Sequence, residues 1–315
     1  MLPQSHFQHP FLFSMKTILF LFSLLSMIAL LLLTPRSTQA CACGCGVYDV
    51  GASYNFPSGP GGMLYGEYDF ASQSHNCHNL GPSAAVNNND KLIQTSWMTA
   101  GVQYFWNNNW GAELIVPSAN RVYIKANDDP TAPPGSTTTV KWWSMGDIRL
   151  NGYYTGFSPD MSTGISFGVK LPTGNWTQPN VDRDNQIGTG STDILVGAFT
   201  RHHFTKDGKW SWFAQAQLDA PIIITSGYRP GIEVDSAAGI YYTGLRIGKV
   251  KIRPIAQAIV SNRTSDSGSA ASSQNTGYQR VMLSPGIEFD IHPIRIYDDA
   301  EMPVFNSVVG QQLIS

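Results

Sequence analysis

The sequence is poor in charged residues. Asp, Glu, Lys and Arg make up 13% of its 315 residues, about half of the ~25% that is usual in soluble domains. The 20 basic and 22 acidic side chains leave a net charge of -2. A surface that binds nucleic acid needs a clustered basic excess, which this chain lacks. Nucleic acid is therefore not expected among its partners.

Long apolar runs are also missing, with one exception near the N-terminus. That run spans residues 18–33, follows Met15 and Lys16, and is succeeded by small and polar residues up to Ala40. A basic start, an apolar core and a small-residue exit are typical of a secretory signal peptide. We therefore predict a signal peptide over residues 1–40, with Met15 as an alternative start. An uncleaved membrane anchor is the other interpretation, although an anchor needs ~20 apolar residues.

Motifs that carry catalysis are absent too. The sequence contains no Gly-x-Ser-x-Gly nucleophile motif and no Cys-x-x-Cys-His motif for covalent haem. We therefore do not expect an enzyme, and we predict no catalytic residue. No cofactor is expected either, apart from a soft metal that one cluster of thiols would allow.

What the sequence does contain, from residue 60 onward, is alternation with a period of two. Between residues 210 and 219, Trp, Ala and Leu alternate with Ser, Phe, Gln and Asp, and residues 165–171 and 281–291 show the same period. In a β-strand this pattern places apolar side chains on one face and polar or small ones on the other. Eleven such segments are predicted, near residues 62–72, 93–105, 110–126, 140–155, 161–173, 189–204, 209–222, 234–247, 250–262, 278–291 and 295–305.

The connections between these segments alternate in length. Tight turns are predicted at 107–109, 158–160, 206–208, 248–249 and 292–293, and long polar loops at 73–92, 127–139, 174–188, 223–233 and 263–277. Short turns at one end and long loops at the other are typical of an outer-membrane β-barrel. A soluble β-sandwich is the alternative, but its strands average ~5–6 residues, whereas a membrane strand needs ~9–11.

The predicted fold class is therefore all-β: an antiparallel, up-and-down transmembrane β-barrel of about 12 strands over residues 62–315. Outer-membrane lipid, and the barrel-assembly machinery during insertion, are the partners that this fold implies. Eleven strands is an odd number, whereas a closed bacterial barrel has an even one. We expect that a last strand is missing after residues 310–315, or that the count is wrong. In the first case residues 62–72 and 295–305 should be neighbours, separated by a gap or paired in parallel.

Three motifs in the middle of the chain follow one another in a fixed order. They are Gly-Asp-Ile-Arg-Leu at 146–150, Gly-Val-Lys-Leu-Pro-Thr-Gly at 168–174 and Ile-Gly-Thr-Gly-Ser-Thr-Asp at 187–193. With them the chain resembles, over residues 60–313, the outer-membrane proteins of the MetA-pathway of phenol degradation family, within a subgroup that has a Cys-rich mature N-terminus. The resemblance implies a barrel in the outer membrane of a Gram-negative cell. It also implies passive transport of a small solute, with an aromatic or hydrophobic one as the candidate class. It identifies no established substrate.

If the apolar face of each strand meets lipid, the other face lines the lumen. Charged residues that alternate with apolar neighbours are therefore the candidate lumen residues. Six are predicted: Lys170, Asp219, Arg246, Arg253, Glu288 and Asp290.

Thiols and imidazoles form two further clusters. Three thiols open the predicted mature chain within residues 41–45, where they could bind a soft metal such as copper or zinc or pair as disulfides. The candidates for metal binding or disulfides are Cys41, Cys43, Cys45, Cys77, His75 and His78. The predicted topology places the two clusters ~25 Å apart across the apolar band, unless residues 41–61, a Cys-rich periplasmic segment, enter the lumen as a plug. The alternative function is then a non-conducting outer-membrane protein that handles a soft metal.

One predicted loop carries an acidic and amide-rich stretch at residues 182–186. Its oxygen atoms could bind calcium or surface sugars. A solvated loop is the simpler interpretation.

Overall fold

The computed structural model describes residues 56–57, 59–82, 88–127 and 129–314. The predicted signal peptide at 1–40 and the thiols of Cys41, Cys43 and Cys45 lie outside the described residues. Within the described ranges, no helix has both the length and the apolar character that a membrane-spanning helix requires.

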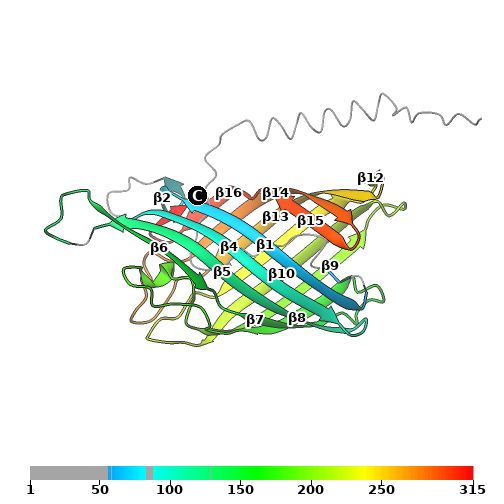
Figure 1. The fold of residues 1–315 in the computed structure, drawn as a ribbon, viewed down its shortest axis with the longest axis horizontal. Coiled ribbons are helices and arrows are strands. Elements are labelled where there is room, and N and C mark those ends of the chain that lie inside the picture. Colours follow the sequence, from blue (N-terminus) through cyan, green and yellow to red (C-terminus); the bar gives the residue numbers. More distant parts are fainter. Residues whose placement is uncertain (1–55, 58, 83–87, 128, 315) are drawn as a thin grey trace, which may run out of the picture. The chain divides into compact units, whose positions relative to one another are not determined.

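Fourteen strands form one antiparallel sheet, which curls into a near-closed barrel (Figure 1). Three pairs of them are halves of a longer strand: β6 and β7 both pair with β5, β11 and β12 with β13, and β15 and β16 with β14. The barrel thus has eleven strand positions. The bounds are β1 (Gly61–Gln73), β4 (Asp90–Phe105), β5 (Trp110–Ala126), β6 (Thr137–Met145), β7 (Arg149–Tyr154), β8 (Thr163–Lys170), β9 (Thr192–His203), β10 (Trp210–Ile223), β11 (Glu233–Tyr242), β12 (Leu245–Ile247), β13 (Val250–Arg263), β14 (Tyr278–Ile291), β15 (Ile294–Asp299) and β16 (Met302–Val308).

Each of the eleven predicted strands is present, and the predicted fold class is confirmed. Short connections gather at one end of the barrel, which we call the turn end: 106–109, 155–162, 204–209, 248–249 and 292–293. The long connections gather at the other, the loop end: 74–89, 127–136, 171–191, 224–232 and 264–277.

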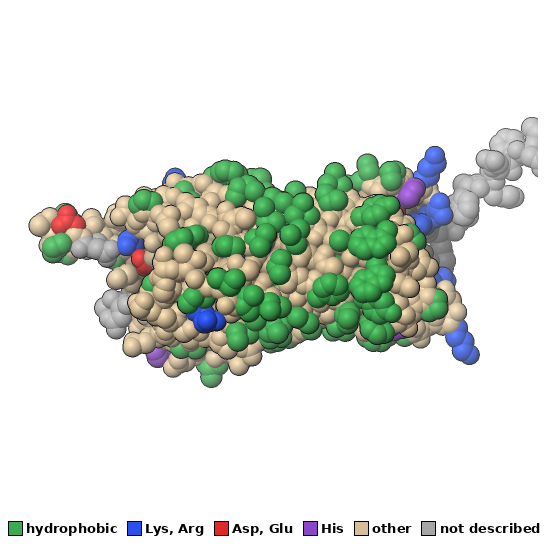
Figure 2. All heavy atoms as spheres, turned by 90° about the horizontal axis from the view of Figure 1, so that it is seen from below, with side chains coloured by type: hydrophobic (Ala, Val, Ile, Leu, Met, Phe, Trp, Pro, Cys, Tyr) green, Lys and Arg blue, Asp and Glu red, His purple; other side chains and the backbone are tan. Residues whose placement is uncertain are grey.

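The period of two separates the outer face of the barrel from its interior. On β1, Leu64 and Phe70 point outward and are 78% and 60% exposed, whereas Tyr65, Glu67 and Asp69 point inward. Large apolar side chains cover the wall of the barrel, and the charged side chains visible in this view lie toward its ends (Figure 2). The outer wall is therefore apolar, although the strands themselves carry many polar groups.

The two edges of the sheet are β1 and the strand formed by β15 and β16. In the part of the chain that the structure describes, these edges do not pair with each other. A second, three-stranded sheet lies at the loop end, in the order β17 (Gln311–Ile314), β2 (His75–His78) and β3 (Gly81–Pro82).

This small sheet ties the two edges together. The amide of Ser74, just after β1, donates to the carbonyl of Ile314 (3.2 Å), and the amide of Val308 in β16 donates to the carbonyl of Asn79 (3.0 Å). The odd strand count and the open edges agree with the sequence prediction. The strand β17 was not predicted, because four residues without clear alternation give too weak a pattern.

Candidate functional site in the barrel interior

The loop between β8 and β9, residues 171–191, folds into the barrel. Asn185, Gln186 and Ile187 are buried, at 4%, 4% and 2% exposure. Ile187 packs in a cluster with Trp97 and Tyr123, which point inward from β4 and β5. The interpretation of residues 182–186 as a solvated loop is therefore wrong for Asn185 and Gln186. The loop returns into the lumen because its neighbours in the barrel wall supply both an apolar contact and hydrogen-bond partners.

The root of this loop is held by Asp147, which lies in the break between β6 and β7. Its buried carboxylate accepts hydrogen bonds from the amide of Gly174 (2.9 Å), the amide of Thr189 (2.7 Å) and the hydroxyl of Thr189 (2.6 Å). The three motifs found in the sequence therefore meet at one point. A carboxylate that accepts several such bonds is a strong structural anchor, because charge-assisted hydrogen bonds are about twice as strong as neutral ones.

Two glycines of these motifs allow the two ends of the loop to approach closely. A Cβ atom built on Gly188 would collide with the backbone of Gly174. The amide of Gly188 also donates to the carbonyl of Asn175 (2.8 Å). Glycine is therefore needed here for space, since a side chain would separate the two segments.

The tip of the loop is held by Arg121 of β5, which is 1% exposed. Its guanidinium donates to the main-chain carbonyls of Asn185 (2.7 Å) and Gln186 (3.4 Å), and its Nε donates to the hydroxyl of Thr95 (2.9 Å). The guanidinium also lies 5.8 Å from the ring centre of Trp97. Arg121 was not among the predicted lumen residues, although the inward-facing alternation of β5 would have identified it.

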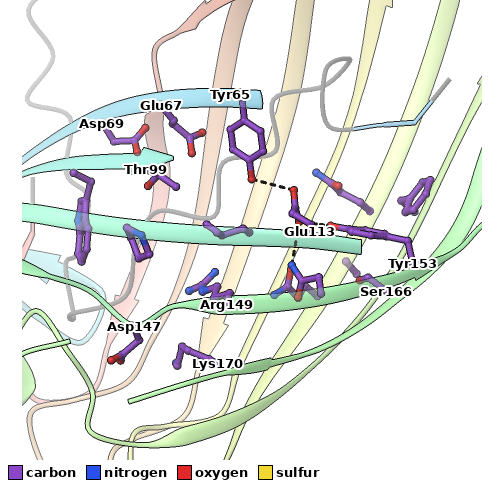
Figure 3. Close-up of a pocket in the computed structure, with 18 of the residues that line it drawn as sticks. Tyr65, Glu67, Asp69, Thr99, Glu113, Asp147, Arg149, Tyr153, Ser166 and Lys170 are labelled. Atoms are coloured by element: carbon purple, nitrogen blue, oxygen red, sulfur yellow. Dashed lines mark hydrogen bonds between the residues drawn. The ribbon is translucent and has the colours of Figure 1, made fainter. Parts of the chain in front are cut away.

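Below the loop lies a cavity of about 150 Å³ in the barrel interior (Figure 3). Phe56 and Ile187 contribute apolar side chains to its lining. Tyr65, Glu67 and Asp69 project into it from β1 (Figure 3).

The carboxylate of Glu113 is a well-connected polar group of this cavity. It accepts hydrogen bonds from the hydroxyls of Tyr65 (3.0 Å) and Tyr153 (2.6 Å) and from the side-chain amide of Asn151 (3.1 Å). Glu113 is 7% exposed, and a buried carboxylate is tolerated only when it is well hydrogen-bonded. The sequence analysis missed Glu113, which alternates with outward-facing Ala112 and Leu114 on β5.

Phe56 lies within an apolar cluster near the turn end. Its ring centre is 5.3 Å from that of Phe199 and 5.8 Å from that of Phe213, and all three side chains are buried. Pro57, which follows Phe56 in the chain, accepts a hydrogen bond at its carbonyl from the guanidinium of Arg201 (2.8 Å). The two residues Phe56 and Pro57, which precede β1, therefore lie inside the barrel.

Lys170 and Asp219, two of the predicted lumen residues, meet in the interior. The ammonium group of Lys170 lies 2.8 Å from the carboxylate of Asp219 and 2.5 Å from that of Asp193. The side chains are 5%, 13% and 1% exposed for Lys170, Asp219 and Asp193. Asp193 ends the third motif and was not predicted as a lumen residue.

Three other predicted lumen residues form a second ionic group, close to the turn end. Arg253 forms an ion pair with Glu288 and another with Asp290, the latter at 2.9 Å. Glu288 is fully buried. The sixth, Arg246, does not join them: it is exposed at the turn end, where its Nε donates to the carbonyl of Gly248 (2.9 Å).

The predicted ligands His75, Cys77 and His78 lie together on β2, but they differ in exposure. Cys77 is 2% exposed and packs against Tyr278 and Ile314, and burial raises the pKa of its thiol. Both histidines are exposed. Among the described residues, no group of three His, Cys, Asp or Glu side chains is arranged to hold a metal ion.

A second cavity, of about 600 Å³, opens at the loop end, and we call it the vestibule. Its lining includes Asp90, Asp182, Asp184 and Asn185. Burial raises the pKa of Asp184 to about 7, with a further contribution from the nearby charges of Asp90 and Asp182. A group with such a pKa changes its charge near neutral pH.

Comparison with known proteins identifies the fold. No family model matches the sequence, and no curated protein matches it. The structure is similar to the crystal structure of an outer membrane channel from Pseudomonas putida F1, with a TM-score of 0.58 and 10% sequence identity, over 84% of this chain and 96% of that one. The resemblance to the MetA-pathway family thus has no support from a family model. The chain has the β-barrel fold of an outer membrane channel.

Proposed function

We propose that the protein is an outer-membrane channel that passes small solutes through the interior of its barrel. The observation that carries this proposal is the apolar outer face of the strands, combined with an interior that holds buried charged and polar side chains beside apolar clusters. Hydrocarbon offers no partner to backbone amides, so helices and closed β-barrels are the structures able to span a bilayer, and this sheet curls into a near-closed barrel. Water-soluble proteins of this size do not expose apolar side chains over a whole wall.

The volume and lining of the cavity favour an aromatic or hydrophobic solute that is about the size of one ring. A cavity of the same volume, about 150 Å³, holds a benzene molecule in another protein. Phe56, Trp97 and Ile187 supply apolar surface to this cavity, while Glu113 and Ser166 supply polar atoms. No reaction is proposed, because the interior groups described above are engaged in structural hydrogen bonds and ion pairs.

The regions before the barrel fit the same proposal. Residues 1–40 would direct export, and residues 41–61 would lie between the signal peptide and the barrel. The position of Phe56 and Pro57 inside the barrel supports entry of that segment into the lumen. The alternative, a non-conducting protein that handles a soft metal, gains no support from β2, where Cys77 is buried and both histidines are exposed.

Conductance in a planar lipid bilayer tests the proposal. The full-length chain, refolded from detergent, should give stepwise currents. A one-ring alcohol such as benzyl alcohol should reduce these currents in a concentration-dependent way, because it occupies the cavity. A barrel that inserts into the bilayer and stays silent would refute the channel.

A matched pair of variants tests the cavity itself. Gln215→Trp places a large ring in the cavity, whose lining includes Gln215, and should remove the block by benzyl alcohol. Gln279→Trp makes the same change at an exposed position of β14 and should leave the block unchanged. Equal block in both variants would show that the solute does not use this cavity.

A further inference from the structure

We call the cavity of about 150 Å³ the inner cavity. Residues 182–189 lie between the vestibule and the inner cavity. Asp182, Asp184 and Asn185 line the vestibule, whereas Ile187 and Thr189 line the inner cavity. We call residues 182–189 the partition segment. The partition segment therefore borders both cavities.

The partition segment belongs to no strand of the barrel. Apart from the short 3-10 helix η2 (Arg183–Asn185) it has no regular structure, and side chains from the wall hold it in place. Arg121 binds the main-chain carbonyls of Asn185 and Gln186 at its tip. Asp147 binds Thr189 at its root.

The two anchors differ in what they hold. Asp147 connects the root to the rest of the loop through Gly174, so it defines where the loop leaves the wall. Arg121 alone of the two reaches the tip, and it does so through main-chain atoms, so its hold does not depend on which side chains the tip carries.

The tip has two further contacts with the wall: the side-chain amide of Asn185 donates to Asp90 of β4 (3.1 Å), and the hydroxyl of Tyr123 donates to Asp182 (3.0 Å). Loss of Arg121 would remove the hold on the main chain and loosen the tip, while the root and the barrel keep their contacts.

We propose that the partition segment is the constriction of this channel, and that Arg121 is the residue that sets the size of the solutes admitted. This inference rests on the proposed channel function. In the observed position the tip places Ile187 against Trp97 and Tyr123, which narrows the passage between the two cavities. Displacement of the tip would join the vestibule to the inner cavity.

The test compares three variants of the full-length protein in planar bilayers, with polyethylene glycols of graded size as probes of the pore. Arg121→Gln should raise the conductance and admit larger polymers than the unmodified chain. Ile187→Ala should also raise the conductance and admit larger polymers, because a smaller side chain widens the passage while Arg121 remains in place. Arg229→Gln is the matched control: Arg229 also donates to a main-chain carbonyl at the loop end, that of Pro221 (2.8 Å), but outside the partition segment.

A second measurement follows the segment itself. Trypsin cleaves after Arg183, which lies within the partition segment. Cleavage of a folded protein requires local opening of the chain, so Arg121→Gln should be cut there faster than the unmodified chain and faster than Arg229→Gln. This measurement does not depend on conductance, and retained heat-resistant migration on a gel shows that the barrel of each variant is folded.

The outcomes separate the two proposals. In one outcome the unmodified chain and Arg121→Gln both conduct, with the same upper size of admitted polymer and the same rate of trypsin cleavage. That result would overturn the role of Arg121 and leave the proposed channel function intact. Larger polymers in Ile187→Ala but not in Arg121→Gln would likewise overturn it. If neither the unmodified chain nor any variant conducts, the channel and the constriction both fail.

Discussion

The buried ion group around Lys170 gives the most direct prediction about stability. Lys170→Met keeps the length of the side chain and removes its charge. It leaves the carboxylates of Asp193 and Asp219 close together in the interior without the ammonium group that contacted them at 2.5 and 2.8 Å. We expect a large loss of stability.

The magnitude follows from these distances. At an effective dielectric constant of about 20, each of the two contacts contributes on the order of 6 kcal/mol of Coulomb attraction. Desolvation of the three groups offsets much of this attraction, so the net loss is smaller. Removing one partner of a buried ion pair costs about 3–5 kcal/mol in measured cases, and we expect Lys170→Met to fall in that range.

Urea unfolding of the protein in phospholipid vesicles, followed by Trp fluorescence, would measure the loss. Lys209→Met is the matched control, because Lys209 pairs with Asp207 in an exposed turn with both side chains about half exposed, and such pairs contribute little. The triple variant Lys170→Met, Asp193→Asn, Asp219→Asn should recover most of the stability, since it leaves no uncompensated charge. A loss below ~1 kcal/mol in Lys170→Met, or a triple variant no better than the single one, would contradict this account.

Three further predictions concern the interior and the loop end of the barrel. Gly188→Ala should displace the loop and increase the conductance. Gly66→Ala is the control and should leave the conductance unchanged, because its added Cβ atom meets only an ordinary contact at 3.9 Å. Equal currents in the two variants would show that the close approach of the loop ends is unimportant. Phe56→Ala should destabilise the barrel by about 3–5 kcal/mol, as loss of a buried ring does, and urea unfolding would show whether the cluster needs this residue. Because the pKa of Asp184 is raised to about 7, its carboxyl is neutral below that pH and charged above it. Cation conductance should therefore rise across roughly pH 6 to 8, about one unit either side of that value, and the rise should vanish in Asp184→Asn.

The strands, the turns and the two faces of each strand could be predicted from the sequence. These features are local: side chains alternate across a strand with a period of two, and turns carry residues such as Asn, Asp, Gly and Pro for conformational reasons. The same rule identified Lys170, Asp219, Arg253, Glu288 and Asp290 as candidates for the interior. It was less useful for Arg246, because a position beside a turn can alternate correctly and still lie at the rim.

The tertiary structure alone decided how the interior is organised. Arg121 and Asn185 are 64 residues apart, and Lys170 and Asp219 are 49 apart, so no spacing in the sequence indicates that they meet. Whether the loop at 171–191 extends into solvent or returns into the lumen depends on the curvature of the wall, which brings inward-facing side chains of β4 and β5 into contact with the loop. Pairing of β17 with β2 likewise depends on bringing the two edges of the sheet together. Alternation determines which side chains face inward, and only the curling of the sheet into a barrel determines which of them touch.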